Sequence, residues 1–132
     1  MLPESYLFLS KLNTPIKRAV REIKGSLQKS GFKIVSELNF SDFIKDCLGI
    51  RLDKKYIILE VCHPFIAYKS LLTTLDTGLF LPIRIVIYED ESGDTVISAL
   101  NPEQVAGLIQ NQVFKLVVKA ASEKLKYTIS SI

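Results

Sequence analysis

The chain has 132 residues, 48% of them hydrophobic, and a formal net charge of +3 at pH 7. These values are typical of one globular domain, residues 1–132, and not of a disordered protein. The weak positive charge argues against a dedicated nucleic-acid binder, which carries a stronger or more concentrated basic surface. No apolar run reaches the ~20 residues of a membrane span, and no signal-peptide pattern opens the chain. We therefore expect a cytoplasmic protein without membrane contact, and abundant Ile and Lys without Trp hint at a thermophilic source.

The chain begins with a predicted strand at residues 5–10, followed by the best-specified helix of the sequence. Thr14 is predicted as its N-cap and Pro15 as its first residue, where the missing N–H of proline costs nothing. Gly31 is predicted to end this helix. Apolar residues recur at helical spacing and predict one buried stripe, formed by Ile16, Ala19, Val20, Ile23 and Leu27.

A second, shorter amphipathic helix is predicted after a strand at residues 32–38. Ser41 is expected to cap it and Gly49 to end it. Its apolar positions are Phe43, Ile44, Cys47 and Leu48.

The second half of the chain continues with a strand at residues 56–62 and a helix that starts at Pro64. Residues 83–89 and 95–100 are predicted to form a hairpin, and Asn101-Pro102 starts another helix. The last predicted helix has one apolar face, formed by Phe114, Val117, Val118, Ala121 and Leu125.

The predicted order of elements is β-α-β-α-β-α-β-β-α-α. This order indicates an α+β fold with a single mixed β-sheet of about five strands and helices mainly on one face. The other face of such a sheet needs cover. Because a second subunit would supply that cover, we expect a homodimer.

Five short motifs in order along the chain carry a resemblance to a known family. They are Gly31-Phe32, Cys62-His63-Pro64, Gly-Leu-Phe-Leu-Pro at residues 78–82, Tyr88-Glu89 and Asn101-Pro102. In these motifs the chain resembles the "domain of unknown function 302" family over nearly its whole length. The resemblance implies a compact, often self-associating α+β domain without a settled activity. His63 stands where the family has Asn and Ile83 where it has Cys, so a two-cysteine mechanism is in doubt for this chain.

Cys62 and His63 are the candidates for catalysis, although we commit to no catalytic residue. They end a strand just before a helix, whose unpaired N–H groups would favour a thiolate at Cys62. The alternatives are a small buried residue for Cys62 and a helix-capping residue for His63. With one histidine and no ligand spacing in the sequence, we expect no metal and no cofactor.

A polar pocket is predicted from the alternation of side chains along two strands. Glu60 and Cys62 share one face of their strand, and Arg84 and Tyr88 share one face of the next. With His63, these residues are the candidate binding site for a small anionic ligand. The alternative is a Glu60–Arg84 salt bridge on a solvated or dimer-facing sheet surface. The apolar linker at residues 78–82 either packs into the core or lines a pocket or subunit contact.

The sequence favours a homodimeric small-ligand-binding or structural module with a pocket at the Cys62-His63-Pro64 turn. The alternative is a single-thiol enzyme or redox sensor, in which Cys62 is the nucleophile, His63 or Glu60 accepts a proton and Arg84 holds an anionic substrate. The third hypothesis, weak nucleic-acid binding by the first and last helices, is the least favoured.

Overall fold

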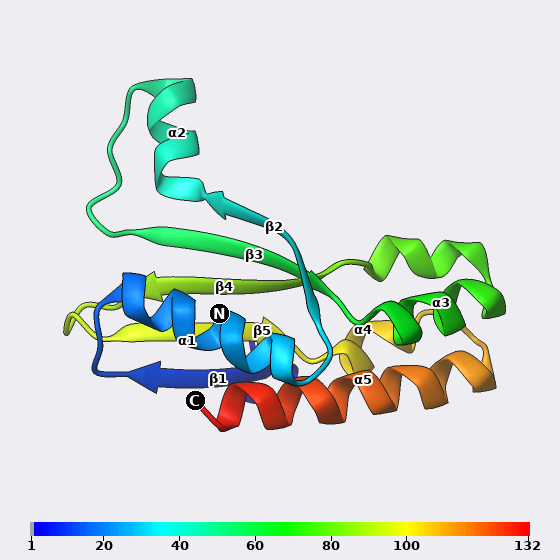
Figure 1. The fold of residues 1–132 in the computed structure, drawn as a ribbon. Helices are drawn as coiled ribbons and strands as arrows, with labels where there is room; N and C mark the ends of the chain where they lie inside the picture. The colour runs from blue at the N-terminus through cyan, green and yellow to red at the C-terminus, as the bar shows by residue number, and fades with distance from the viewer. Residues whose placement is uncertain (1) are drawn as a thin grey trace.

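The computed structural model describes residues 2–132, whose five strands form one sheet in the order β1-β5-β4-β3-β2 (Figure 1). The strands are β1 (Leu7–Leu12), β2 (Lys33–Asn39), β3 (Tyr56–Cys62), β4 (Ile83–Glu89) and β5 (Thr95–Leu100). The α-helices are α1 (Ile16–Lys29), α2 (Phe40–Leu48), α3 (Pro64–Thr73), α4 (Pro102–Ala106) and α5 (Gln112–Ser130). Two 3-10 helices are η1 (Glu4–Tyr6) and η2 (Leu75–Phe80).

The α+β class, the single five-stranded sheet and the order of elements are confirmed, but the predicted mixed sheet is wrong. All neighbouring strands are antiparallel. Alternating strands and helices usually give parallel pairs, because the helix carries the chain back across the sheet. Here α2 and α3 lie beyond opposite ends of the strands that they join, so β3 and β4 each return directly beside the preceding strand (Figure 1). Among the α-helices that join strands in residues 2–132, only α1 crosses the sheet, from one edge strand to the other.

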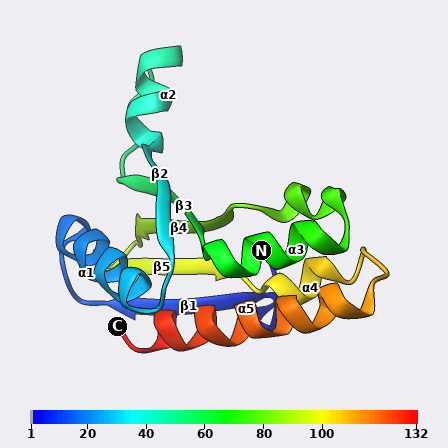
Figure 2. The same ribbon diagram turned by 45° about the vertical axis from the view of Figure 1, so that its right-hand side comes forward.

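The core lies between one face of the sheet and helices α1 and α5. Every second residue of β3 is buried there, at Ile57, Leu59 and Val61, and β4 adds Ile85 and Ile87. The predicted stripe of α1 is buried against them, from Ile16 to Leu27. Figures 1 and 2 show α2 and α3 at the ends of the sheet, so the helices cover mainly one face, as predicted.

The ends of α1 show one wrong and one confirmed prediction. Pro15, and not Thr14, is the N-cap, because the Pro15 carbonyl accepts the N–H of Arg18. At the other end Gly31 has a left-handed φ of +89°, and the Phe32 N–H donates to the Leu27 carbonyl. This arrangement is the glycine-ended helix that the sequence predicts.

The start of α2 also differs from the prediction. The Asn39 side chain, and not Ser41, accepts the N–H of Asp42 at 3.1 Å. The Ser41 hydroxyl oxygen instead accepts the first N–H of β3, from Tyr56, at 2.7 Å. The Ser41 side chain, which the local sequence predicts as a helix cap, therefore forms a long-range hydrogen bond to β3 instead. Gly49 ends α2 as predicted, with φ of +69°.

The bounds predicted for β3, β4 and β5 are confirmed. The first strand lies two residues later than predicted, because the chain first makes η1. The linker expected before β4 forms η2.

Candidate functional site

Glu60 and Arg84 are direct cross-strand partners on the sheet face opposite the core. Arg84 Nη2 lies 3.8 Å from Glu60 Oε2, and Glu60 Oε1 accepts the Ser36 hydroxyl at 2.8 Å. The predicted proximity is thus present, although antiparallel neighbours and not a crossover produce it. The Arg84 side chain is 67% exposed, so its guanidinium keeps donors available for another anion.

Tyr88 lies apart from this pair. It is opposite Tyr56, and the two rings stack with centroids 5.7 Å apart. Burial, together with neighbouring Tyr88, raises the pKa of Tyr56. Tyr88 is four residues from Arg84 along β4, a separation of roughly 13 Å in a strand. Tyr88 therefore belongs to a different row of the sheet.

Cys62 ends β3 and is half-buried. Burial raises the pKa of the Cys62 thiol, a direction that disfavours a thiolate at neutral pH. Within residues 2–132, Cys62 and His63 make no hydrogen bond with each other. Cys47 is exposed on α2, beyond the opposite end of β3, and both cysteines are free. The single-thiol hypothesis for Cys62 stays a prediction.

His63 is the N-cap of α3, where its Nδ1 accepts the N–H of Ile66 at 3.4 Å. Its ring meets the edge of Phe32 with centroids 5.6 Å apart, and a Cβ on Gly31 would lie 2.9 Å from its Nε2. Burial, and next the charge of Lys124, lower the pKa of His63, so the ring is neutral at pH 7. An Asn at this position could accept the same N–H, so the departure from the family motif keeps the cap.

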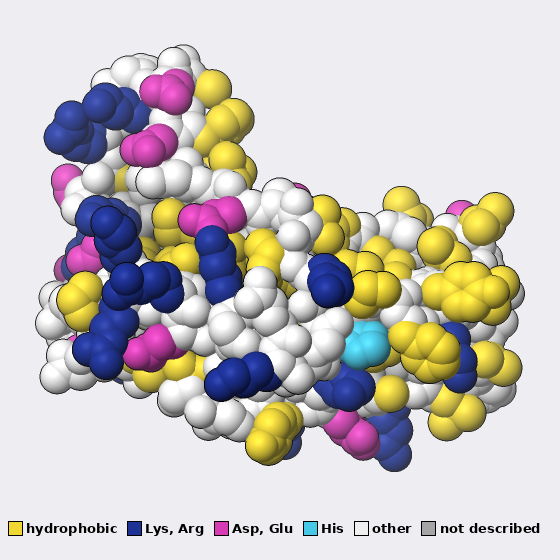
Figure 3. Space-filling model, viewed as in Figure 1, with side chains coloured by type: hydrophobic (Ala, Val, Ile, Leu, Met, Phe, Trp, Pro, Cys, Tyr) yellow, Lys and Arg dark blue, Asp and Glu magenta, His cyan; other side chains and the backbone are white. Residues whose placement is uncertain are grey.

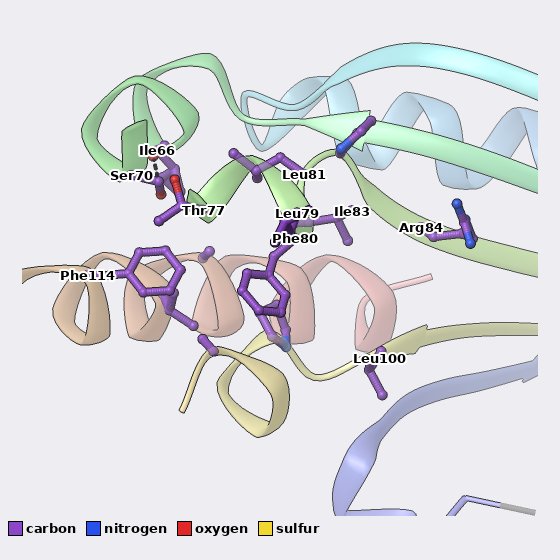
Figure 4. A pocket seen from close by; sticks show the side chains of 15 residues that line it. Ile66, Ser70, Thr77, Leu79, Phe80, Leu81, Ile83, Arg84, Leu100 and Phe114 are labelled. Atoms are coloured by element: carbon purple, nitrogen blue, oxygen red, sulfur yellow. Dashed lines mark hydrogen bonds between the residues drawn. The ribbon is translucent and has the colours of Figure 1, made fainter. Parts of the chain in front are cut away.

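A separate cavity of about 260 Å³ lies between η2, α3, α4, α5 and the adjoining ends of β4 and β5. Figure 4 shows Thr77, Phe80 and Phe114 in the space between η2 and α5. The apolar wall includes Ile66, Phe80, Leu81, Phe114, Val118 and Ala121. Arg84 is the only charged residue that lines it among the described residues.

The polar side chains inside this cavity are two buried hydroxyls. Ser70 donates to the Ile66 carbonyl at 2.8 Å, and Thr77 donates to the Thr74 carbonyl at 2.9 Å. Because each hydroxyl proton is used within the fold, either oxygen would serve a ligand only as an acceptor. The cavity thus combines an apolar body, two acceptors and one cation.

Of the predicted ligand-binding residues, only Arg84 lines this cavity. Glu60 lies beside Arg84 on the sheet, and Cys62, His63 and Tyr88 lie elsewhere. The sequence signal for the cavity was the apolar segment at residues 78–82, of which Leu79–Pro82 form part of the wall. The two hydroxyls carried no such signal, because Ser and Thr are common throughout surface helices.

His63 instead lines a broad groove between α3 and α5. Figure 3 shows the histidine beside hydrophobic side chains at this end of the molecule. The apolar lining of the groove includes Phe65, Leu72, Val113 and Leu116, and its charged residues are Lys69 and Lys124.

The described residues do not bring three His, Cys, Asp or Glu side chains together in a group that could hold a metal ion. No helix formed by residues 2–132 is both long and apolar enough to cross a membrane.

Comparison with known proteins gives the family of the chain. Among solved structures it is similar to an uncharacterised conserved DUF302 protein from Bacillus stearothermophilus, with a TM-score of 0.87 and 22% identity over 95% of this chain and 96% of that one. This likeness shows a shared fold. No curated protein matches the chain. The model of the family described as "Domain of unknown function DUF302" matches residues 9–132, and the chain therefore belongs to this family.

Proposed function

We propose that this protein is a homodimeric module that binds a small, largely apolar anion in the cavity beside Arg84. The observation that carries the proposal is an apolar cavity of about 260 Å³ whose lining includes one charged residue, Arg84. Packed interiors leave few voids larger than a water molecule, so this volume exceeds ordinary packing defects. Since a 150 Å³ apolar cavity holds benzene, this one suits a ligand of about ten non-hydrogen atoms.

The polar groups of the cavity define the ligand further. Arg84 lies 3.8 Å from Glu60, beyond hydrogen-bond distance, so a ligand carboxylate beside Arg84 would gain charge-assisted bonds that Glu60 does not already make. The acceptors Ser70 and Thr77 would suit a hydroxyl or N–H of the ligand. An apolar carboxylate is therefore the ligand class that fits best.

The dimer part of the proposal is supported by the sheet face opposite the core, which we name the open face. One cross-strand row runs over all five strands of this face and carries no charge. The row consists of Leu9, Ser98, Val86, Ile58 and Leu38. Leu9 is 54% exposed and Leu38 40% exposed. The row lies between the Glu60–Arg84 pair and Lys11, and its exposed leucines on the two edge strands support a subunit contact there.

Calorimetry with 3-phenylpropionate and its amide tests the ligand proposal, because the two probes have the same shape and differ in charge. The carboxylate is expected to bind about tenfold more tightly or better, as one charge-assisted hydrogen bond would give. Arg84→Gln should remove this preference, whereas Arg51→Gln, an exposed control, should keep it. Ala121→Leu should abolish binding of both probes by filling the cavity. Binding of neither probe to the unmodified protein, or an unchanged preference in Arg84→Gln, would contradict the proposal.

Light scattering tests the dimer. We expect twice the chain mass of 14.9 kDa at micromolar concentration. A mass of 14.9 kDa at 100 µM, well above the concentration at which specific dimers form, would contradict it.

A further inference from the structure

Helix α5 has two apolar stripes at helical spacing, and the fold buries one of them. The buried stripe consists of Phe114, Val118, Ala121, Leu125 and Ile129. The second stripe lines the broad groove between α3 and α5 and consists of Val113, Leu116, Val117 and Ala120. Its spacing of i, i+3, i+4 and i+7 is that of a helix side that packs against another element. Val113 is nevertheless 61% and Leu116 70% exposed, so residues 2–132 leave this side of α5 largely uncovered.

The facing side of α3 is open in the same way. Phe65, Lys69 and Leu72 line the groove from α3 and follow the same helical spacing. Phe65 is 60% and Leu72 67% exposed. Figure 3 shows hydrophobic side chains gathered beside the histidine at this end of the molecule. Binding sites for small molecules enclose most of their ligand, whereas this groove of about 790 Å³ has open walls. The groove therefore suits a segment of a larger molecule.

The lining residues set the length of that segment. They span residues 65–73 on α3 and 113–124 on α5. At 1.5 Å per residue these walls are about 12 Å and 16 Å long. The two helices run antiparallel, since His63 at the start of α3 lies beside Lys124 late in α5. A third helix of about ten residues, or three turns, would fill the groove over its length.

The charged lining of the groove has one sign. Lys69 and Lys124 line it, and no Asp or Glu of the described residues does. The ion pairs formed within residues 2–132 include neither lysine, so both ammonium groups are available to a partner. The Lys69 ammonium lies 4.8 Å from the centre of the Phe65 ring, which places its charge directly beside the apolar wall. Lys69 is six residues beyond His63 along α3, about 9 Å, so the two lysines are separated by nearly two helical turns.

We propose that this groove is a docking site for an acidic amphipathic helix of another protein, about three turns long. The apolar side of that helix lies between α3 and α5, as in other complexes in which a helix binds a groove. Carboxylates two turns apart on the helix pair with Lys69 and Lys124. This inference is independent of the cavity beside Arg84 and of the homodimer.

Three synthetic peptides test the partner chemistry by fluorescence anisotropy. The first is a blocked, alanine-based peptide of about twelve residues with leucines along one side and glutamates two turns apart. The second has lysines in place of the glutamates, and the third has a central proline, which breaks a helix. We expect the glutamate peptide to bind at least about tenfold more tightly than either of the others.

Matched variants of the protein test the groove itself. Leu116→Asp should weaken binding of the glutamate peptide at least about tenfold, because it places a charge on the apolar wall. Leu48→Asp is its control, since Leu48 is similarly exposed, at 65%, and lies in α2 far from the groove. Both side chains are exposed, so circular dichroism should show an intact fold.

A charge exchange gives the sharpest reading. The double variant Lys69→Glu/Lys124→Glu should bind the lysine peptide more tightly than the glutamate peptide, which reverses the original preference. Lys17→Glu/Lys126→Glu is the control, because these two exposed lysines lie outside the groove, and it should keep the preference for glutamate.

Several results would overturn the inference. The first is a glutamate peptide that does not bind the unmodified protein at about 1 mM. Equal binding of the proline peptide would exclude a helix, and a preference unchanged by the charge exchange would exclude pairing with the two lysines. Binding to phosphatidylserine vesicles that Leu116→Asp abolishes, without peptide binding, would assign the groove to a membrane surface. A dimer lost in Leu116→Asp would assign it to a second copy of the chain.

Discussion

Helices α1 and α2 have the same kind of sequence pattern but differ in where they lie relative to the sheet. Each has an apolar stripe at helical spacing and each ends at a left-handed glycine, Gly31 or Gly49. The stripe of α1 is buried in the core, whereas α2 buries no residue. The difference lies in the connections: α1 crosses the sheet, while α2 joins two adjacent strands and lies beyond their ends. An amphipathic pattern thus predicts a surface to be covered and does not identify what covers it.

The largest expected difference is between alanine substitutions in the two stripes. Leu27→Ala should lower the free energy of unfolding by about 2–5 kcal/mol, because Leu27 is fully buried and a cavity would remain. Leu48→Ala should change it by less than about 0.5 kcal/mol in the monomer, since Leu48 is 65% exposed. Urea unfolding at submicromolar concentration measures both values. A cost near 2 kcal/mol for Leu48→Ala would mean that α2 packs within its own chain.

A smaller difference is expected between the glycines that end the two helices. Alanine at either position meets an unfavourable positive φ, at about 1–2 kcal/mol. At Gly31 the added Cβ would also lie 2.9 Å from His63 Nε2, whereas at Gly49 no neighbouring atom of residues 2–132 lies within 4 Å of the added Cβ. Gly31→Ala should therefore cost about 1 kcal/mol more than Gly49→Ala, as a displaced packing contact does. Equal costs in thermal unfolding would show that His63 moves aside freely.

The smallest expected effect is the loss of folding stability at low pH. This loss should come from His63, which lies between the end of α1 and the start of α3, and not from α2. The folded pKa of His63 lies below its ordinary value of 6.5, so the unfolded chain takes up the proton first as the pH falls. This contribution to stability is complete above pH 6.5 and is lost as the pH falls from 6.5 through the folded pKa. Protonation also removes the acceptor that caps α3.

Unfolding of the His63→Asn variant at pH 7.5 and pH 5 measures this contribution. The variant keeps a capping side chain and should lose only roughly a few tenths of a kcal/mol of pH dependence, since the ring is partly exposed and screened. The matching cap of α2, Asn39, does not titrate. An unchanged pH dependence would assign the acid sensitivity to other groups.

The sequence by itself determined the elements whose signals are local. The stripe from Ile16 to Leu27, the strand from Tyr56 to Cys62 and the hairpin around Gly93 follow from side-chain period and turn chemistry, which act over a few residues. Strand alternation also placed Glu60 and Arg84 each on one face of its strand, and the antiparallel register then made them direct partners.

Only the tertiary structure decided the antiparallel pairing, the cavity and the exposure of α2. Whether a helix crosses a sheet or lies beyond its end depends on the packing of distant segments, and the local period is the same in both cases. The cavity is lined by Ser70, Thr77, Arg84 and Phe114, which come from four separate segments. No spacing in the sequence predicts that these residues line one cavity. Ser41 shows the same limit at one residue, since its hydroxyl bonds to Tyr56 fifteen positions away instead of capping its own helix. Local preferences are weak, and a long-range partner of similar energy redirects them.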